Sequence, residues 1–420
     1  MSNLKKWLSI LLVSLLAFTL AACSGNSESS SGDSSGSGTK LTFWAPFSGA
    51  DGPKMKEIVE NYNKSQDDYN VKLQIVPQSE YYKTVDLAIN GEKNMPDFLI
   101  MHEDQLLTYV NKDVLKDLDD VVGDDIKKED YHPKAWEGAT VNDKLYAVPL
   151  DIHPLMLYWN KDMFKEAGLD PDTPPKTRDE FINFAKKLTD KDKRQYGYVV
   201  PTLWPQQFIF PSIVAQNGGN LMKDGELQYT TDPVVEALQF ERDLIDKYKV
   251  SPSDVSQDGE VTMFLQGKNA MQLNGPWMMN QFEEAGINYG VAPVPQLGTE
   301  KQAVFANSHT FVIPKQVEDQ DKIDGITDFL GYVKENGMAW AESGQAPASK
   351  AVYESDEFQK MKQQPQVAKQ FDDVVFSPRV ENWGQISEPL YQAINEVLLG
   401  QKDAKEALKE AQQKAQGSLK

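Results

Sequence analysis

The sequence predicts an α/β protein built from two lobes, and three observations carry this prediction. The chain has 420 residues, which is more than a single hydrophobic core usually serves. From Lys40 to Met101 the apolar pattern alternates between strand and helix, an order typical of a parallel sheet with crossover helices. The stretch Tyr146–Gly168 then has the pattern of a chain that passes from one sheet into another.

The stretch Tyr146–Gly168 consists of an apolar strand, a short polar break and a second apolar strand. The first strand carries Pro149, which a central position in a sheet would not tolerate, and the break ends at Pro154. Asn160 suits the N-cap of the helix that follows, and Gly168 suits its left-handed terminator. We therefore expect a crossing between two sheets; the alternative is two neighbouring strands of one sheet joined by a turn.

Polar and aromatic residues follow the expected strands of the first lobe. These strands are Lys40–Trp44, Val71–Val76 and Pro96–Met101. In parallel sheets, ligands bind beyond the carboxyl ends of the strands. Trp44 and the tripeptide His102–Asp104 fall at such ends, which places them near an expected ligand.

The region beyond the crossing repeats this organisation. Trp204 follows an expected strand at Tyr196–Val200, and Trp277 follows another at Asn269–Leu273. The tail is expected to be helical, with one apolar stripe that ends at Gly400.

Three motifs carry a resemblance to a known family. Y-A-V-P, followed by L-x-Y-x-N-K-x-x-F-x-x-A-G-L-x3-T-P-P-x-T, lies at Tyr146–Thr177. F-x-x-G-x-x-A-M-x-x-x-G-x-W lies at Phe264–Trp277, and G-V-A-P-V-P lies at Gly290–Pro295. Together they resemble the extracellular solute-binding proteins that feed ABC importers, and are most similar to the maltodextrin and multiple-sugar branch. The resemblance spans about Lys40 to Gln416.

Two positions depart from the pattern of that family. Family members usually have Tyr-Asn-Lys, whereas Trp159 is inserted here between Tyr158 and Asn160. They also usually have Trp after the threonine of the motif, where this chain has Arg178. Neither departure falls on the expected ligand face.

The resemblance implies a two-lobed, periplasmic-binding-protein-like fold of type II, with a mostly parallel sheet flanked by helices in each lobe and the ligand cleft between them. The chain would cross between lobes near residues 149–154, 295–307 and 344–349. We therefore expect an N-terminal lobe formed by residues 40–149 and about 303–345. The C-terminal lobe is expected to contain residues 150–302 and about 346–420.

The N-terminus resembles a lipoprotein signal. Two lysines precede an apolar run at Trp7–Leu20, and Leu-Ala-Ala leads into Cys23, the single cysteine of the chain. We expect Met1–Ala22 to be removed and Cys23 to carry the lipid; the run is shorter than the roughly 20 apolar residues of a spanning helix. Residues Cys23–Thr39 are expected to form a tether, because Ser24–Thr39 contains eight Ser and four Gly among sixteen residues and behaves as a coil.

Charge and cysteine content exclude several classes. The net charge is −20, and removal of the first 22 residues, with two lysines and no acidic residue, would make it −22. Such a charge argues against binding to nucleic acid or adsorption to anionic lipid. One cysteine allows neither a disulfide nor a cysteine metal cluster within the chain.

A carbohydrate site needs aromatic rings for the apolar faces of the sugar, and carboxylates or amides for its hydroxyls. We expect such residues at strand ends, at the crossings and before the tail helix. The ligand-binding residues that we expect are Trp44, Glu80, Glu103, Asp151, His153, Trp204, Gln206, Asn274, Trp277, Asn307, His309 and Trp383.

Two other functions remain open from the sequence. His102, His153 and His309 lie in loops that face the expected cleft, and Glu103 or Asp151 would complete a zinc site; Tyr81-Tyr82 would suit ferric iron. A secreted glycosidase with paired acids is the other alternative, although none of the common catalytic motifs accompanies the acidic residues.

The favoured expectation is a lipid-anchored receptor that holds a sugar or oligosaccharide between two lobes and performs no chemistry on it. The resemblance implies that a membrane permease, powered by an ATPase, recognises the closed form. We expect a monomer on the extracellular face of the cell membrane that needs neither a cofactor nor a metal ion and is not an enzyme.

Overall fold

The computed structural model describes residues 38–47, 49–91 and 94–419. The expected signal peptide, Cys23 and the tether up to Ser37 lie outside the described residues. Among the helices of the described part, none combines the length and the apolar character that crossing a membrane would require.

The first lobe is built on a five-stranded sheet with the order β2-β1-β3-β15-β6. Strand β1 is parallel to β2 and β3, whereas β15 is antiparallel to β3 and β6. One strand of the five thus runs against the other four. The strands are β1 (Thr39–Ala45), β2 (Tyr69–Ile75), β3 (Phe98–His102), β6 (Val148–Pro149) and β15 (His309–Val312).

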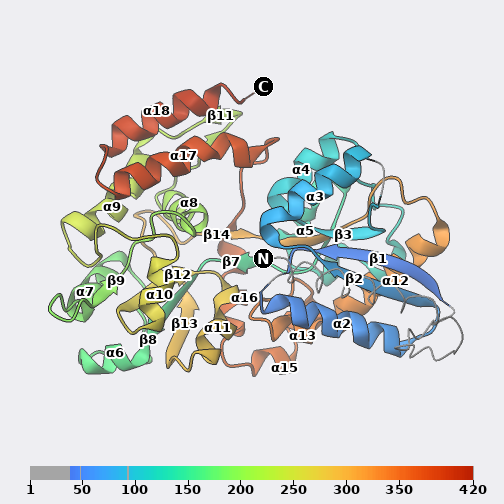
Figure 1. The fold of residues 1–420 in the computed structure, drawn as a ribbon, viewed down its shortest axis with the longest axis horizontal. Coiled ribbons are helices and arrows are strands. Elements are labelled where there is room, and N and C mark those ends of the chain that lie inside the picture. Colours follow the sequence, from blue (N-terminus) through green and yellow to red (C-terminus); the bar gives the residue numbers. More distant parts are fainter. Residues whose placement is uncertain (1–37, 48, 92–93, 420) are drawn as a thin grey trace, which may run out of the picture. The chain divides into compact units, whose positions relative to one another are not determined.

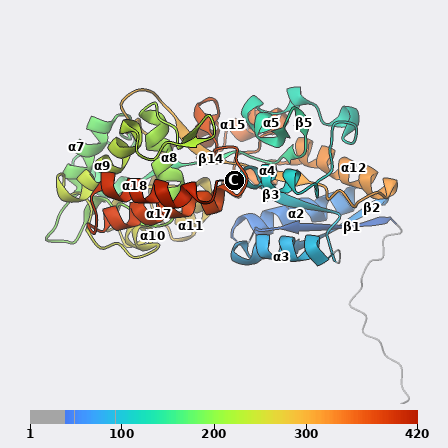
Figure 2. The same cartoon turned by 90° about the horizontal axis from the view of Figure 1, so that it is seen from above.

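Helices cover both faces of this sheet. Phe43 of β1 and Phe329 of α12 have ring centroids 6.0 Å apart, and Tyr62 of α2 lies 5.1 Å from Phe329. Helix α3 lies on the opposite side from α12 (Figure 2), where it buries Val85. The helices are α2 (Asp51–Ser65), α3 (Gln78–Gly91), α4 (Glu103–Asn111), α5 (Pro133–Ala139), α12 (Gln320–Asn336) and α13 (Met338–Ala341).

The second lobe is built on a four-stranded sheet with the order β13-β8-β12-β9. Strand β8 is antiparallel to β13 and β12, and β12 is parallel to β9. Three of these four strands therefore share one direction, so each lobe has the mostly parallel sheet that was expected. The strands are β8 (Met156–Asn160), β9 (Tyr196–Tyr198), β12 (Asn269–Asn274) and β13 (Tyr289–Pro293).

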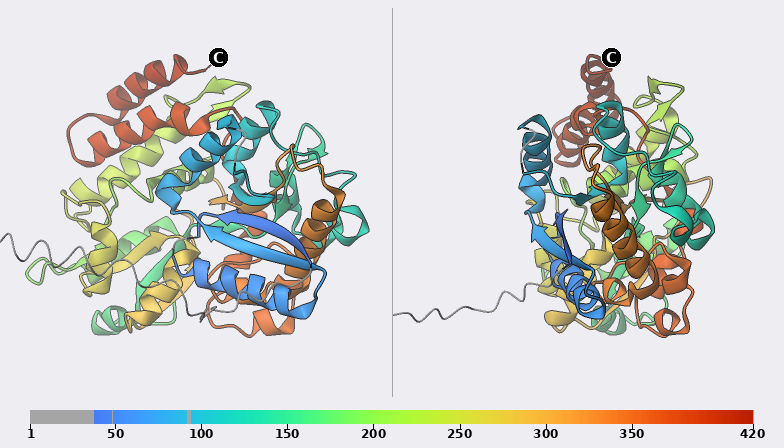
Figure 3. Two further views of the ribbon diagram at one scale, coloured as in Figure 1. Left: turned by 45° about the vertical axis from the view of Figure 1, so that its right-hand side comes forward. Right: turned by 90° about the vertical axis from the view of Figure 1, so that its right-hand side faces the viewer.

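The helices of this lobe include two that pack side by side at the C-terminus, α17 and α18 (Figures 1 and 3). The tail was expected to be one helix ending at Gly400, which does end α17 with φ +74°; α18 follows it. The helices are α6 (Lys161–Glu166), α7 (Arg178–Leu188), α8 (Gln206–Gln216), α9 (Asp232–Asp246), α10 (Gly259–Leu265), η3 (Pro276–Met278), α11 (Met279–Glu284), α17 (Trp383–Leu398) and α18 (Ala404–Gln416).

A small three-stranded sheet, β16-β14-β7, lies where the chain changes sheet. Strand β7 (His153–Pro154) follows β6 and leads into β8, and β14 (Val304–Asn307) follows β13 and leads into β15. Because β6 and β8 belong to different sheets, the expected crossing is confirmed. The alternative of two neighbouring strands in a single sheet is wrong. Pro149 lies in β6, at the edge of its sheet.

The local signals around the first crossing act as expected. The Asn160 side chain accepts hydrogen bonds from the backbone N–H groups of Asp162 and Met163, both at 3.0 Å, and so caps α6. Gly168 has φ +70° after the helix, a conformation that favours glycine. The helix that follows the crossing is therefore bounded by signals that are readable from the sequence.

The remaining elements are short and connect these parts. They are β4 (Thr140–Val141), β5 (Lys144–Leu145), β10 (Met222–Lys223), β11 (Glu226–Leu227), β16 (Val374–Val375), α14 (Lys350–Tyr353), α15 (Asp356–Gln359), α16 (Pro365–Ala368), η1 (Gly123–Asp125), η2 (Lys128–Asp130) and η4 (Phe371–Asp373).

Candidate functional site

A large pocket lies between elements of the two sheets. Its volume is about 1430 Å³. The first lobe contributes the loop before α2 and the starts of α3 and α4; the second contributes the start of α8, the segment η3–α11 and α17. Strands β7 and β14, which join the sheets, form the floor. The pocket thus lies where the sequence predicted a ligand, at the strand crossings.

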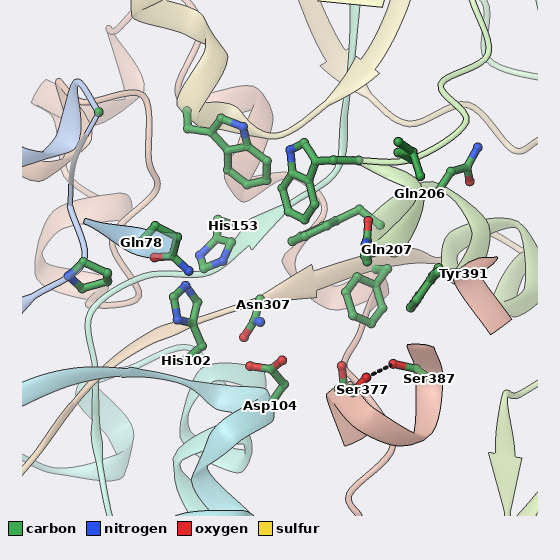
Figure 4. A pocket seen from close by; sticks show the side chains of 18 of the residues that line it. Gln78, His102, Asp104, His153, Gln206, Gln207, Asn307, Ser377, Ser387 and Tyr391 are labelled. Atoms are coloured by element: carbon green, nitrogen blue, oxygen red, sulfur yellow. Dashed lines mark hydrogen bonds between the residues drawn. The ribbon is translucent and has the colours of Figure 1, made fainter. Parts of the chain in front are cut away.

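Seven of the twelve residues expected from the sequence line this pocket. They are His153, Trp204, Gln206, Trp277, Asn307, His309 and Trp383. Figure 4 shows Asn307 beside Asp104, with Ser387 and Tyr391 across the pocket from them.

An aromatic wall forms one side of the pocket. The rings of Trp204 and Trp277 have centroids 6.0 Å apart and planes inclined by 30°. Phe208 lies at 5.5 Å and 5.4 Å from these rings, and Phe305 lies 5.2 Å from Phe208. Trp204 is 39% exposed, so an apolar surface is available to a ligand. Aromatic faces of this kind cover the C–H faces of sugar rings.

The pocket also offers hydrogen-bond acceptors. Asp104 Oδ1, Gln207 Oε1 and Gln345 Oε1 are buried, and none has a hydrogen-bond partner among the described residues. Burial raises the pKa of Asp104, although hydrogen bonds from Asn307 and Gln105 lower it. Buried polar atoms are normally paired, so these three oxygens suit a ligand that brings hydroxyl donors.

Gln206 has a different part in the site. Its Nε2 donates to Glu241 Oε2 at 2.6 Å and to the Pro201 carbonyl at 2.7 Å. Burial raises the pKa of Glu241 to about 8. The Gln206 side chain therefore fixes the start of α8, from which Gln207 and Phe208 reach the pocket. Gln206 belongs to the pocket lining, but its amide nitrogen is already bonded to other protein groups.

The five other expected residues lie outside the pocket lining. Trp44 is inside β1 and only 7% exposed, because the strand continues to Ala45. Glu80 is exposed in the first turn of α3, where its carboxylate lies 3.7 Å from Lys83 Nζ. Asn274 Oδ1 accepts the N–H of Gly275 at 2.8 Å and is buried. These three side chains are held by the protein rather than directed at a ligand.

Glu103 and Asp151 are likewise turned away from the pocket. Glu103 is buried against Gly138, lies 3.7 Å from Arg379, and has its pKa raised to about 8 by burial. Asp151 is 0% exposed. Its Oδ1 accepts from His153 Nδ1 at 2.9 Å and from the His309 N–H at 3.0 Å.

Hydrogen bonds to Asp151 connect the segments of the first two crossings. Its Oδ2 accepts from His309 Nδ1 at 2.7 Å and from Trp340 Nε1 at 2.9 Å, and its backbone carbonyl accepts from Ser308 Oγ at 2.6 Å. Burial acts to raise the pKa of Asp151, but the His309 and His153 rings outweigh it and hold that pKa well below its ordinary value. Asp151 lies outside the pocket lining and positions His153 and His309, which line it.

The structure does not support the use of Tyr81 and Tyr82 together for ferric iron. Tyr81 is fully buried, and its hydroxyl donates toward the Ile100 and Trp44 carbonyls at 2.6 Å and 3.1 Å. Only Tyr82 lines the pocket, where its hydroxyl lies 2.7 Å from His102 Nδ1.

The lining residues that the sequence did not single out as ligand contacts come from many elements, and two groups of them carry a readable signal. His102 and Asp104 flank the chosen Glu103 at the end of β3, and Tyr391 lies on α17. Trp383, Ser387, Tyr391 and Asn395 recur every four residues and line the pocket together. That spacing places them on one face of a helix, a signal that was available in the sequence.

Gly275 makes room for the aromatic wall. A Cβ at this position would lie 2.0 Å from the Trp277 ring, although its φ of −82° and ψ of 170° suit any residue. Replacing Gly275 with Ala is therefore expected to displace the ring and weaken ligand binding about 10-fold, with a smaller effect on the unfolding temperature. Isothermal titration calorimetry checks this. Gly384→Ala is the matched control, because a Cβ there meets no atom within 4 Å; equal losses in both variants would contradict the prediction.

Comparison with known proteins gives consistent results. The family model described as bacterial extracellular solute-binding protein matches residues 47–340. The chain is 28% identical to the galactooligosaccharide-binding protein of Bacillus subtilis, with 100% of this chain and 99% of the relative covered. It is 25% identical to the maltooligosaccharide ABC transporter solute-binding lipoprotein of Streptococcus pneumoniae, over 95% of this chain and 93% of the relative.

A solved structure supports the fold. An ABC substrate-binding protein of Listeria monocytogenes in complex with cycloalternan superposes with a TM-score of 0.79. It is 22% identical, and the match covers 91% of this chain and 99% of that one. None of these three proteins is named for a metal ion, so they do not support a metal-ion receptor. Since the family model covers well over half of the sequence, the chain belongs to the bacterial extracellular solute-binding proteins.

Proposed function

We propose that this chain is a lipid-anchored receptor on the outer face of the cell membrane that captures an uncharged oligosaccharide and delivers it to the permease of an ABC importer. The observation that carries the proposal is that the Trp204–Trp277 wall lines the same pocket as the unpaired buried oxygens of Asp104, Gln207 and Gln345. A sugar ring has two apolar faces and a rim of hydroxyl donors, so it matches both kinds of surface at once.

The volume of the pocket favours an oligosaccharide over a single sugar ring. About 1430 Å³ exceeds the roughly 300–1,000 Å³ of common small-molecule sites. The relatives named for galactooligosaccharide and maltooligosaccharide support the same class of ligand. Stereochemistry decides between such sugars, so the proposal is restricted to the class.

The charge of the lining favours a neutral ligand. Its ionisable residues are Asp51, Asp104, Glu284, Glu388, Glu396 and the three histidines. Among the described residues that line the pocket, none is Lys or Arg. An acidic saccharide would bring its carboxylates toward these groups without a cation to pair them, which is unfavourable.

Ligand capture would proceed by closure of the lobes. We infer that the chain crosses between the lobes near residues 149–154, 295–307 and 344–349. Residues 40–149 and about 303–345 form one lobe, and residues 150–302 and about 346–420 form the other. A ligand that contacts α4 and α8 together binds the closed form better, and this difference in affinity drives closure. The function is binding without chemistry on the sugar, by a monomer attached through Cys23.

Thermal unfolding in the presence of saccharides tests this function. The purified whole chain is expected to be stabilised by neutral gluco- or galactooligosaccharides, by about 4 kcal/mol at a ligand concentration near 1,000 times Kd. Uronic-acid oligosaccharides of equal length serve as the control and should give no shift. Stabilisation by the acidic sugars alone, or release of product from a chromogenic glycoside, would contradict the proposal.

A further inference from the structure

Three of the four histidines of the chain converge at one end of the pocket. We call His102, His153 and His309 the histidine cluster. Their candidate ligand nitrogens all lie within 4.8 Å of one another. The ring centroid of His309 lies 4.3 Å from that of His153 and 4.8 Å from that of His102. Figure 4 shows His102 and His153 turned toward each other, although they come from β3 and β7.

Each ring of the cluster is held through its Nδ1 atom. His153 Nδ1 and His309 Nδ1 donate to the two oxygens of Asp151, at 2.9 Å and 2.7 Å. His102 Nδ1 lies 2.7 Å from the Tyr82 hydroxyl. The atoms left to coordinate an ion are therefore the three Nε2 atoms. Histidines that bind metals are typically oriented in this way, by a carboxylate or another oxygen at the second nitrogen.

The charge of the surroundings suits a cation. The pocket carries Asp51 and Asp104 and, among its described lining residues, neither Lys nor Arg, which favours entry of a cation.

We propose that the histidine cluster binds one divalent first-row transition-metal ion, of the zinc type, through the three Nε2 atoms. Three neutral histidines with an open fourth position form a common zinc site. Because Zn–N bonds are about 2.0–2.1 Å long, three coordinating nitrogens would lie about 3.3 Å from one another. One candidate ligand atom from each ring already lies within 4.8 Å of the other two.

The fourth position would face the pocket. His153 lies 6.0 Å from Trp277, measured between ring centroids, so a bound ion is next to the wall expected to hold the sugar. A water molecule or a sugar hydroxyl is the natural fourth ligand. The ion is a resident of the pocket and not its cargo, and the site is independent of the proposed transport of sugar.

Titration of the whole metal-free chain with zinc chloride, without sugar, tests the site. One zinc ion per chain is expected by calorimetry and equilibrium dialysis. His102→Gln, His153→Gln and His309→Gln should each weaken binding at least about 100-fold. The matched control is His132→Gln. His132 is the fourth histidine, caps α5 and pairs with Asp372 at 3.3 Å, outside the pocket; its replacement should leave zinc affinity unchanged.

Two further measurements test the coordination of the bound ion and the folding of each variant. The cobalt-substituted chain should show the intense visible absorption of a four-coordinate ion, which the His102→Gln variant should lose. Thermal unfolding without zinc shows whether each variant is folded, and Asp151→Asn should weaken zinc binding about 10- to 100-fold by releasing two rings.

The proposal is overturned if the wild-type chain binds less than one zinc ion at micromolar concentration. It is also overturned if a folded variant without His102 and His153 binds zinc as tightly as the wild type, or if cobalt gives only the weak bands of a six-coordinate ion. A chain that binds zinc but no saccharide would support this site and contradict the transport proposal, so the two failures are distinct.

Discussion

Replacing Asp151 with alanine is expected to lower the free energy of unfolding by about 4 kcal/mol. The carboxylate is fully buried and accepts hydrogen bonds from the His309 N–H, both histidine Nδ1 atoms and Trp340 Nε1. Alanine would leave these donors buried without an acceptor, and each costs about 1–3 kcal/mol. Removing one partner from a buried charged network typically costs about 3–5 kcal/mol in total. Denaturant unfolding measures the change.

Two other variants serve as comparisons for Asp151→Ala. Asp151→Asn keeps one acceptor oxygen and should cost less than alanine. Asp324→Ala removes an exposed carboxylate of α12 that, within the described part of the chain, accepts a hydrogen bond from Gln320 alone, and it should change stability by no more than about 0.5 kcal/mol. If Asp151→Ala matched Asp324→Ala, the assignment of Asp151 as the tie between the crossings would be wrong.

Replacing Trp204 with alanine is expected to reduce the affinity for the oligosaccharide about 30-fold. Trp204 is 39% exposed and forms the outer part of the aromatic wall against Trp277. Loss of a central aromatic contact costs about 2 kcal/mol or more of binding free energy, and 1.4 kcal/mol corresponds to a factor of about ten. The unfolding temperature without ligand should change little, because the side chain is only partly buried.

Leu203→Ala is the matched control for Trp204. Leu203 adjoins Trp204, lines the same pocket and is 43% exposed, but it has no ring to stack on a sugar. Its replacement should weaken binding by less than about threefold. Equal losses of oligosaccharide affinity for Leu203→Ala and Trp204→Ala in calorimetry would show that the wall acts as general apolar surface. That result would contradict the stacking of Trp204 on a sugar ring.

The fold was largely predictable because its signals are local. Pro149 excluded a central strand position, Asn160 marked a helix start and Gly168 marked its end, and each acts so in the structure. The short helix α18 was missed, because its buried stripe consists mainly of alanine and resembles a polar surface pattern. Local rules thus find the crossings but underrate weakly apolar helices.

The site was less predictable because side-chain direction depends on rotation within an element. The end of β3 was correctly expected near the pocket, yet α4 begins at Glu103, which turns that side chain inward toward Gly138 and leaves His102 and Asp104 on the lining. Strand length had the same effect on Trp44, which β1 keeps in the core. A sequence locates such a turn but not which of its neighbours faces the ligand.

The absence of a side chain at Gly275, next to the Trp277 ring, has an evolutionary consequence. Since the dihedral angles of Gly275 are open to every amino acid, a single codon change there can tilt the indole without breaking any hydrogen-bonded strand. A substitution at Gly275 would therefore change the sugar preference through a residue outside the pocket lining, by moving the Trp277 ring that lines it.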